Sequence, residues 1–165
     1  MGFLDRLFGQ KDWETYVSGK HGFQVSYPKE WSVREREDGI DIHPPDFHMA
    51  MEPELGVEIP TPGVHIAVRD ASGRDGGEAK DVLRARSNIY EDYRVLNHIG
   101  NDVPKAESAV VYEFAFTSRG TALHACSVIA RKGSRIFDIK ACENAGTFEA
   151  VQKTFRQIVK GFKVE

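Results

Sequence analysis

The sequence has no long apolar run and very little cysteine. No stretch approaches the roughly 20 consecutive apolar residues that a helix needs to cross a bilayer, so we do not expect the chain to span a membrane. The two cysteines, Cys126 and Cys142, are too few for a disulfide scaffold, although one bridge stays open in an oxidising compartment. A reducing compartment is the expectation.

An excess of charge of one sign is also missing. The 22 Lys and Arg residues and the 25 Asp and Glu residues give a formal net charge of -3, and the two signs are interleaved. Because nucleic-acid binding needs clustered cations, we expect no nucleic-acid partner. The start of the chain also lacks a signal-peptide pattern, since Asp5 interrupts its apolar stretch and no basic leader precedes it. These features predict a cytoplasmic protein.

The composition is otherwise that of an ordinary folded protein. With 165 residues, of which 41% are hydrophobic and 28% charged, the chain is long enough for one domain with a well-buried core. We place this domain at residues 13–165. Residues 1–12 precede it as a separate short segment.

The segment 1–12 carries an apolar stripe at helical spacing, which predicts a short amphipathic N-terminal helix. The apolar positions are Phe3, Leu4, Leu7 and Phe8. So short a helix is marginal in water and needs a covering surface, which could be its own domain, a partner protein or the inner membrane surface. Only Arg6 and Lys11 are available to meet anionic lipid headgroups, which weakens the membrane alternative.

Hairpins are predicted in the first part of the domain. Strands at 13–18 and 23–27 flank a turn at 19–22, and strands at 32–37 and 40–43 flank Asp38-Gly39, a dipeptide favoured in tight turns. Five prolines then fall between residues 44 and 63. Since proline fixes a backbone angle and lacks an amide donor, this stretch predicts a long irregular loop.

Strands and two helices are predicted in the second part. A strand at 64–69 and a glycine-rich turn at 73–77 precede a helix at 78–93, followed by a strand meander at 109–117, 122–131 and 135–142. A final helix follows Thr147, which can cap it, and Gly161 ends it. Hairpin-joined strands with two separate helices indicate an α+β fold in which helices cover an antiparallel sheet.

The opening of the domain carries a family resemblance. Residues 22–31, with the sequence GFQVSYPKEW, resemble the G-F-x-φ-x-Y-P-x-x-W signature of the PsbP-like family, which includes the extrinsic photosystem II protein, bacterial relatives and the similarly folded Ran-binding Mog proteins. The order of the predicted elements fits over residues 13–164. The resemblance implies an antiparallel β-sheet sandwiched between helices and a role in binding or assembling other proteins. An oxygen-evolving role is not carried over, because no transit peptide is recognised. No metal site of the family is carried over either, because its ligands cannot be matched to residues of this sequence.

The signature also has a purely structural interpretation. Phe23, Val25 and Tyr27 need only face inward from a strand that Pro28 ends, and Trp31 needs only to anchor the core. This architectural role is the one we expect.

Two groups of residues suggest chemistry. Asp41, His43 and His48 could converge on a metal, since carboxylate and imidazole suit zinc, but their spacing is not that of paired ligands and solvated loop histidines are the alternative. The second group is His124, Cys126 and Cys142.

The thiol hypothesis depends on a hairpin register. If Gly133 centres the turn, Cys126 lies opposite Lys140 and Cys142 opposite His124, so that all share one face. An imidazole beside a thiol can activate it, whereas cysteines that only pack are the alternative.

The sequence therefore predicts a non-catalytic protein-binding or assembly module without a cofactor. Its protein partner is unknown, a peripheral membrane contact is open, and the chain is expected to be a monomer or a weak dimer. The alternatives are a small metal-dependent or thiol-dependent enzyme, and a carrier of an apolar small molecule held between sheet and helix.

Overall fold

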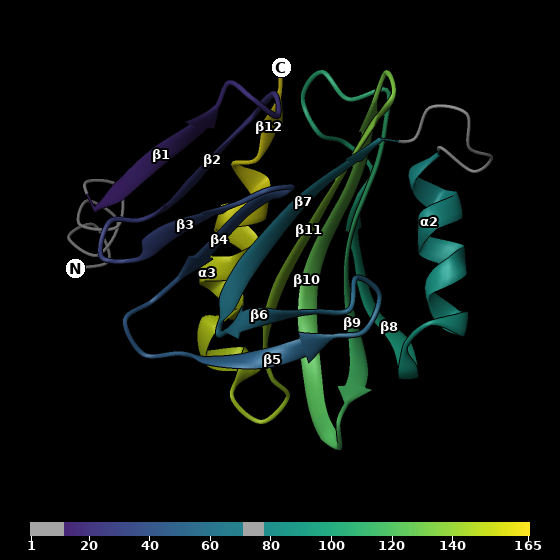
Figure 1. Ribbon diagram of the computed structural model, residues 1–165. Coiled ribbons are helices and arrows are strands. Elements are labelled where there is room, and N and C mark those ends of the chain that lie inside the picture. Colours follow the sequence, from purple (N-terminus) through teal and green to yellow (C-terminus); the bar gives the residue numbers. More distant parts are fainter. Residues whose placement is uncertain (1–11, 71–77) are drawn as a thin grey trace.

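The computed structural model describes residues 12–70 and 78–165, and its centre is a seven-stranded antiparallel sheet (Figure 1). The strand order is β3-β4-β7-β11-β10-β9-β8. These strands are β3 (Ser32–Arg36), β4 (Gly39–His43), β7 (Gly63–Asp70), β8 (Glu91–Gly100), β9 (Ser108–Ser118), β10 (Thr121–Lys132) and β11 (Arg135–Asn144). The predicted meander is present as β9, β10 and β11, each paired with the next.

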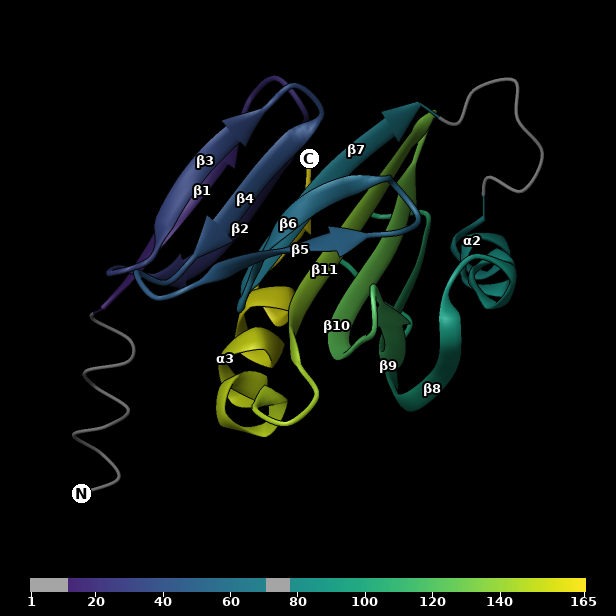
Figure 2. The same ribbon diagram turned by 60° about the horizontal axis from the view of Figure 1, so that its bottom comes forward.

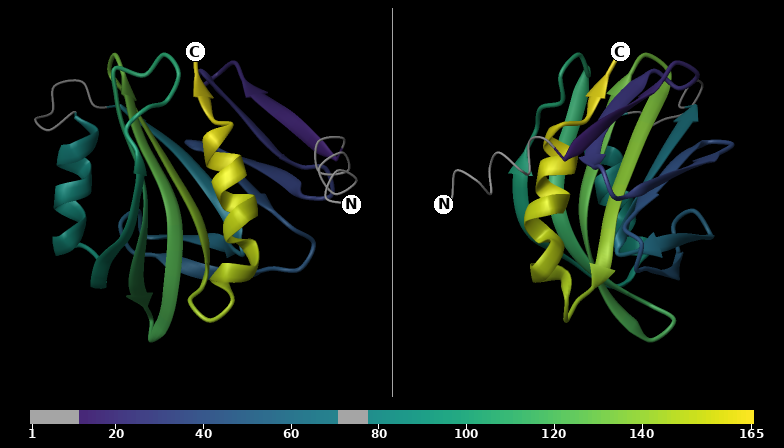
Figure 3. Two further views of the ribbon diagram at one scale, coloured as in Figure 1. Left: turned by 180° about the vertical axis from the view of Figure 1, so that it is seen from behind. Right: turned by 90° about the vertical axis from the view of Figure 1, so that its left-hand side faces the viewer.

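One face of this sheet is covered by helix α3 (Phe148–Lys160) and by a small second sheet (Figure 3). The second sheet has the order β1-β2-β12, with β1 (Trp13–Ser18), β2 (Phe23–Pro28) and β12 (Lys163–Val164). The predicted first hairpin is thus confirmed, but it belongs to this separate layer. The strand β12 at the end of the chain was not predicted.

The signature residues lie in the core between these layers. Phe23 and Val25 are fully buried and Tyr27 is 7% exposed. Trp31 packs edge-on against Phe155 of α3, with ring centroids 6.4 Å apart. The expected architectural role of the signature is therefore what the packing provides.

Helix α3 packs through an apolar stripe at the predicted three- and four-residue spacing. Phe148, Phe155, Ile158 and Val159 are its buried residues. Gly161 ends the helix, where its amide donates to the carbonyls of Gln157 and Ile158. Thr147 stands at the start but makes no side-chain capping bond, so the predicted cap is wrong.

The opposite face carries helix α2 (Ala79–Ala85), a 3-10 turn (Arg86–Asn88) and a hairpin of β5 (His48–Glu52) and β6 (Val57–Thr61). A second apolar cluster lies beneath them, in which Phe114, Phe116 and Leu123 are almost fully buried. Helices thus lie on both faces of the antiparallel sheet, which confirms the predicted α+β arrangement.

The hairpin β5–β6 replaces the irregular loop predicted for residues 44–63. Pro60 is tolerated within β6 because this sheet has only two strands, so β6 has an edge that needs no amide donor. The predicted irregular loop is therefore wrong. Proline is compatible with these strands because a two-stranded ribbon needs few backbone hydrogen bonds.

The helix predicted for 78–93 is also wrong in its second half. It ends near Arg86, and residues from Glu91 onward form the edge strand β8. The spacing of Ile89 and Tyr93 mimics a helical stripe, yet Ile89 is exposed and Tyr93 belongs to a strand.

The amino-terminal helix predicted over Phe3, Leu4, Leu7 and Phe8 lies outside the described residues. Within residues 12–70 and 78–165, no helix has the length and apolarity that crossing a bilayer requires.

Candidate functional site

A row of polar side chains crosses the α2 face of the large sheet. One residue from each of six adjacent strands faces the next in register. They are Arg34, Asp41, His65, Lys140, Ser127 and Tyr112. Polar groups in such a position cost free energy unless they are paired, so this row is the first place to search for function.

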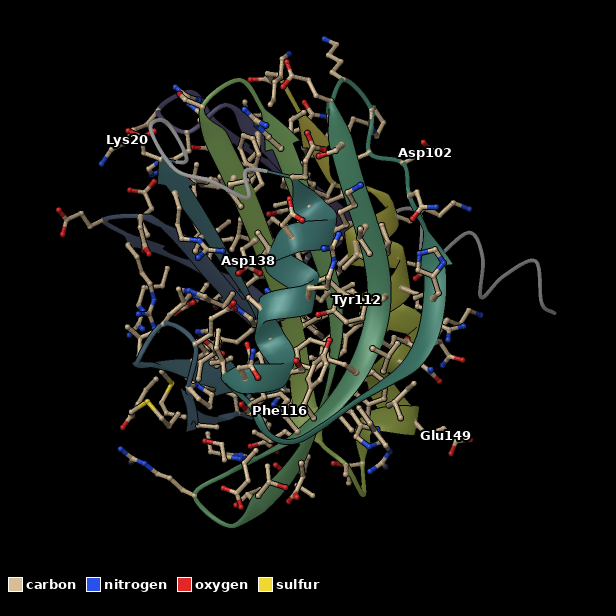
Figure 4. The ribbon with its side chains drawn as sticks, turned by 90° about the vertical axis from the view of Figure 1, so that its right-hand side faces the viewer. Lys20, Asp102, Tyr112, Phe116, Asp138 and Glu149 are labelled. Atoms are coloured by element: carbon tan, nitrogen blue, oxygen red, sulfur yellow. The ribbon has the colours of Figure 1, made fainter. Side chains whose placement is uncertain are left out.

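The 3-10 turn places a buried arginine, Arg86, against the middle of this row. The Arg86 side chain is fully buried and its Nη2 donates to both carboxylate oxygens of Asp138, at 2.8 and 2.9 Å. Its Nη1 donates to the hydroxyls of Tyr112 at 2.7 Å and Ser127 at 3.1 Å. Figure 4 looks onto this face, with Asp138 and Tyr112 labelled beside helix α2.

Lys140 is the second buried cation, and it links the sheet to the β5–β6 hairpin. Its Nζ lies 3.0 Å from Asp138 and 2.9 Å from Glu54, which is in the turn after β5. Glu52 completes the group, because it accepts hydrogen bonds from the Tyr90 hydroxyl and from two backbone amides of the hairpin turn. We call Glu52, Glu54, Arg86, Asp138 and Lys140 the ionic cluster.

The surroundings keep Asp138 and Lys140 ionised. Burial alone would raise the pKa of Asp138, but the charges of Arg86 and Lys140 outweigh burial and hold it well below its usual range. Burial also lowers the pKa of Lys140, yet the nearby carboxylates, Asp138 first, raise it overall. Burial raises the pKa of Tyr90, which therefore stays a neutral donor to Glu52.

The ionic cluster is closed to substrates in this conformation. Glu54 is its most exposed member, with 6% of its side chain accessible, and the other four are buried. Its acids and bases bind one another, so none is positioned to exchange a proton with a bound molecule. The cluster instead joins β11, the 3-10 turn and the hairpin.

Asp41 is similarly occupied by neighbours. It accepts from His65 Nδ1 at 2.7 Å, Arg36 at 2.6 Å and Arg34 at 3.0 Å. Burial would raise its pKa, but the bonds from His65 and Arg36 lower it overall. The Asp41 carboxylate is thus already hydrogen-bonded to side chains of its own domain.

The two histidines proposed with Asp41 as metal ligands lie apart from this arrangement. The His43 ring packs on Phe47, with centroids 3.8 Å apart, and His48 is exposed at the start of β5. Across residues 12–70 and 78–165, no three histidine, cysteine or acidic side chains are gathered as a metal would require. The structure therefore does not bring the predicted ligand set together.

The register behind the thiol hypothesis is wrong by one residue. Lys132 pairs with Arg135, so Gly133 and Ser134 together form the turn, and Cys126 faces Ala141 while Cys142 faces Ala125. A one-residue slip moves a side chain to the other face of the sheet. Cys126 accordingly lies in the α3-side core and Cys142 in the α2-side core.

Both cysteines are free and buried, and their thiols are not activated. Burial, then the charge of Glu113, raises the pKa of Cys126 to about 12. Burial also raises the pKa of Cys142. His124 shares a face with Cys126 but not with Cys142, so the three residues form no common site.

Several apolar side chains open to solvent lie instead in or just before strand β8, the outer edge of the large sheet (Figure 2). Val17, Phe47 and Met49 are also exposed, on other parts of the chain. Ile89, Val95 and Ile99 are 41%, 48% and 43% exposed, although such residues are normally covered. The ladder between β8 and β9 is interrupted by three shifts of register. Bulges of this kind make an edge strand a poor template for indiscriminate pairing.

Sequence patterns alone did not predict the ionic cluster, although they contain a signal for part of it. Asp138 and Lys140 fall two residues apart in the predicted strand 135–142, which is otherwise apolar after Arg135, and this spacing places both on one face of a buried sheet. Their opposite charges indicate an internal ion pair. Nothing in the local sequence identifies Arg86 as the third member, since its contact with Asp138 joins distant segments.

Comparison with known proteins supports the fold. The chain is similar to the cyanobacterial PsbP (CyanoP) of Synechocystis sp. PCC 6803, with a TM-score of 0.61 and 11% identity over 93% of both chains. It is also similar to LpqN of Mycobacterium tuberculosis, a protein involved in cell envelope biogenesis, with a TM-score of 0.62 and 10% identity over 95% of this chain and 94% of LpqN.

A third solved structure, from Bacteroides thetaiotaomicron, matches with a TM-score of 0.56 and 13% identity, over 92% of this chain and 48% of that one. No family model and no curated protein sequence matches the chain. The likeness is thus one of fold at low sequence identity.

Proposed function

Because the chain has a PsbP-like fold, we propose that it is a non-catalytic accessory module that binds or helps assemble another protein. The observation that carries this proposal is the contrast between its interior and its edge. The buried acids and bases are bound to one another, whereas apolar side chains are exposed along the segment 89–99. Exposed apolar groups at a sheet edge are typical of binding surfaces.

The contact surface of this module is the segment 89–99. Its partner is a protein with a complementary apolar patch, because Val95 and Ile99 offer apolar area while the register shifts oppose extension of the backbone ladder. The opposite edge strand, β3, is short and carries Arg34, Glu35 and Arg36, which makes it less suited to an apolar contact.

Replacing both Val95 and Ile99 with lysine should reduce recovery of the specific partner about tenfold or more, because two apolar contacts are replaced by charges that would have to be desolvated. The tagged variants would be expressed in the natural host, and co-purifying proteins would be quantified by mass spectrometry. Both residues are exposed, so folding should be retained.

Val17→Lys is the matched control. Val17 is 55% exposed on β1, away from β8, and its replacement should leave partner recovery unchanged. If the Val95/Ile99 variant recovered as much partner as wild type, the segment 89–99 would not be the contact surface. The same conclusion would follow if Val17→Lys lost as much partner as that variant.

A further part of the proposal assigns the apolar residues Phe3, Leu4, Leu7 and Phe8 to a contact with the partner or with a membrane surface. Deleting residues 1–12 should abolish sedimentation with vesicles containing anionic lipid if the contact is with lipid, or reduce protein co-purification if it is with the partner. Unchanged results in both assays would show that this segment has no binding role.

A further inference from the structure

A depression opens where strand β8 begins, beside the end of β9 and the start of β10. Its volume is about 460 Å³, which falls in the range of small-molecule sites. The ladder between β8 and β9 shifts register between Glu91 and Arg94, and Asp92 has a positive φ of 53°. This bulge separates β8 from regular pairing with β9 and leaves the depression beside it.

The depression combines small apolar residues with a few polar ones. The small side chains of Ala115 and Ala122 share the sheet face of His124, and Ala145 also lines the depression. Leu123 and Phe116 border it too, although their side chains are buried in the apolar cluster on the α2 face. Asp92, Arg94 and His124 contribute charge and ring nitrogens. Apolar walls with a few converging polar groups are typical of ligand sites.

Arg94 differs from the arginines that are paired within the domain. Arg86 binds Asp138, and Arg156 binds both carboxylate oxygens of Glu113. The Arg94 side chain, by contrast, is exposed and makes no hydrogen bond or ion pair within the described part of the chain. It is therefore available to an anion from outside.

His124 stands beside this cation. Its ring packs edge-on against Phe148, with centroids 5.4 Å apart, and its nitrogens have no hydrogen-bond partner among residues 12–70 and 78–165. Burial and then the charge of Arg94 lower its pKa, although Glu113 acts in the opposite sense. A neutral imidazole can donate one N–H bond to a ligand.

We propose that this depression binds a small monocarboxylate with a short apolar body. Arg94 and the imidazole N–H of His124 donate to the carboxylate, and the apolar body rests against the alanines. Asp92 lines the same depression, so a second negative charge on the ligand is disfavoured. The carboxylate can belong to a free acid or to the carboxyl terminus of a peptide, which present the same chemistry.

Although Arg94 lies within the segment 89–99, this inference does not rest on the partner surface proposed there. Its test variants change Arg94 and Ala122 and leave Val95 and Ile99 intact. Its test uses the full chain with four probes, namely isovalerate, isovaleramide, succinate and the tripeptide Gly-Gly-Leu. Binding is followed by calorimetry and by the NMR signals of the His124 ring. Isovalerate should bind saturably and shift those signals, whereas isovaleramide and succinate should bind at least tenfold more weakly.

The peptide separates the two sources of the carboxylate. Tighter binding of Gly-Gly-Leu than of isovalerate would indicate a peptide terminus, and weaker binding a free acid. Comparable binding of isovalerate and its amide would overturn the proposal, because a carboxylate would then not be recognised.

Two variants locate the site. Arg94→Gln should weaken isovalerate binding at least tenfold, and Ala122→Leu should weaken it similarly by filling the depression without changing charge. Arg84→Gln is the control, since Arg84 is 69% exposed on α2 outside the depression, and it should bind as wild type does. Wild-type binding by both test variants would overturn the proposal.

Discussion

Replacing Asp138 with alanine should lower the free energy of unfolding by about 3–5 kcal/mol. Asp138 is fully buried and is the shared counter-charge of Arg86 and Lys140, both also buried. Its removal leaves two cations in a medium that solvates them poorly, and Glu52 and Glu54 would have to compensate. Urea denaturation followed by circular dichroism would measure the loss.

The matched control is Asp81→Ala on helix α2. Asp81 forms an ion pair with Arg84 at 3.3 Å, but Arg84 is 69% exposed, so water already screens the pair. This replacement should change the free energy of unfolding by less than about 1 kcal/mol. A comparably small effect at Asp138 would mean that the cations of the ionic cluster reach water or another acid when it is lost.

We expect the ionic cluster to contribute more to selecting one arrangement of the elements than to net stability. Apolar residues of similar size can replace a buried ion pair without loss of stability in other proteins. Here the pairs join segments that are distant in sequence, since Glu54 follows β5, Arg86 follows α2 and Asp138 lies in β11. A misplaced hairpin or helix would leave charges unpaired, and the cluster therefore favours one arrangement of these elements.

Local patterns predicted the elements whose signal is local. Alternating residues of β2, the meander β9–β11 and the apolar stripe of α3 were all recognisable, because strand and helix periods expose one face to the core. The signature at residues 22–31 led to the PsbP-like fold for the same reason.

The predictions failed where a distant contact decides the structure. Residues 91–100 form a strand because they pair with β9, a contact that helical spacing cannot reveal. The one-residue difference at Gly133 placed Cys142 on the wrong face. The polar row and the depression at Arg94 and His124 likewise depend on register, so neither could be located from the sequence.

Gly39 is required for a different reason from the tight turn that the sequence suggested. The Asp38-Gly39 pair predicted a turn, and a hairpin is indeed present, but Arg36 pairs with Gly39, so the turn is at Glu37 and Asp38. Gly39 does not have a positive φ. A β-carbon at Gly39 would overlap the backbone carbonyl of Ile66 in β7.

Gly39→Ala should therefore lower the free energy of unfolding by about 3 kcal/mol, because β4 and β7 would have to separate within the core sheet. Gly19→Ala is the control, since a β-carbon there meets no atom within 4 Å, and its effect should stay within about 0.5 kcal/mol. Chemical denaturation of both variants would measure the difference. Equal stabilities would mean that β7 can yield at Ile66 without cost, and that the close approach of these strands does not constrain position 39.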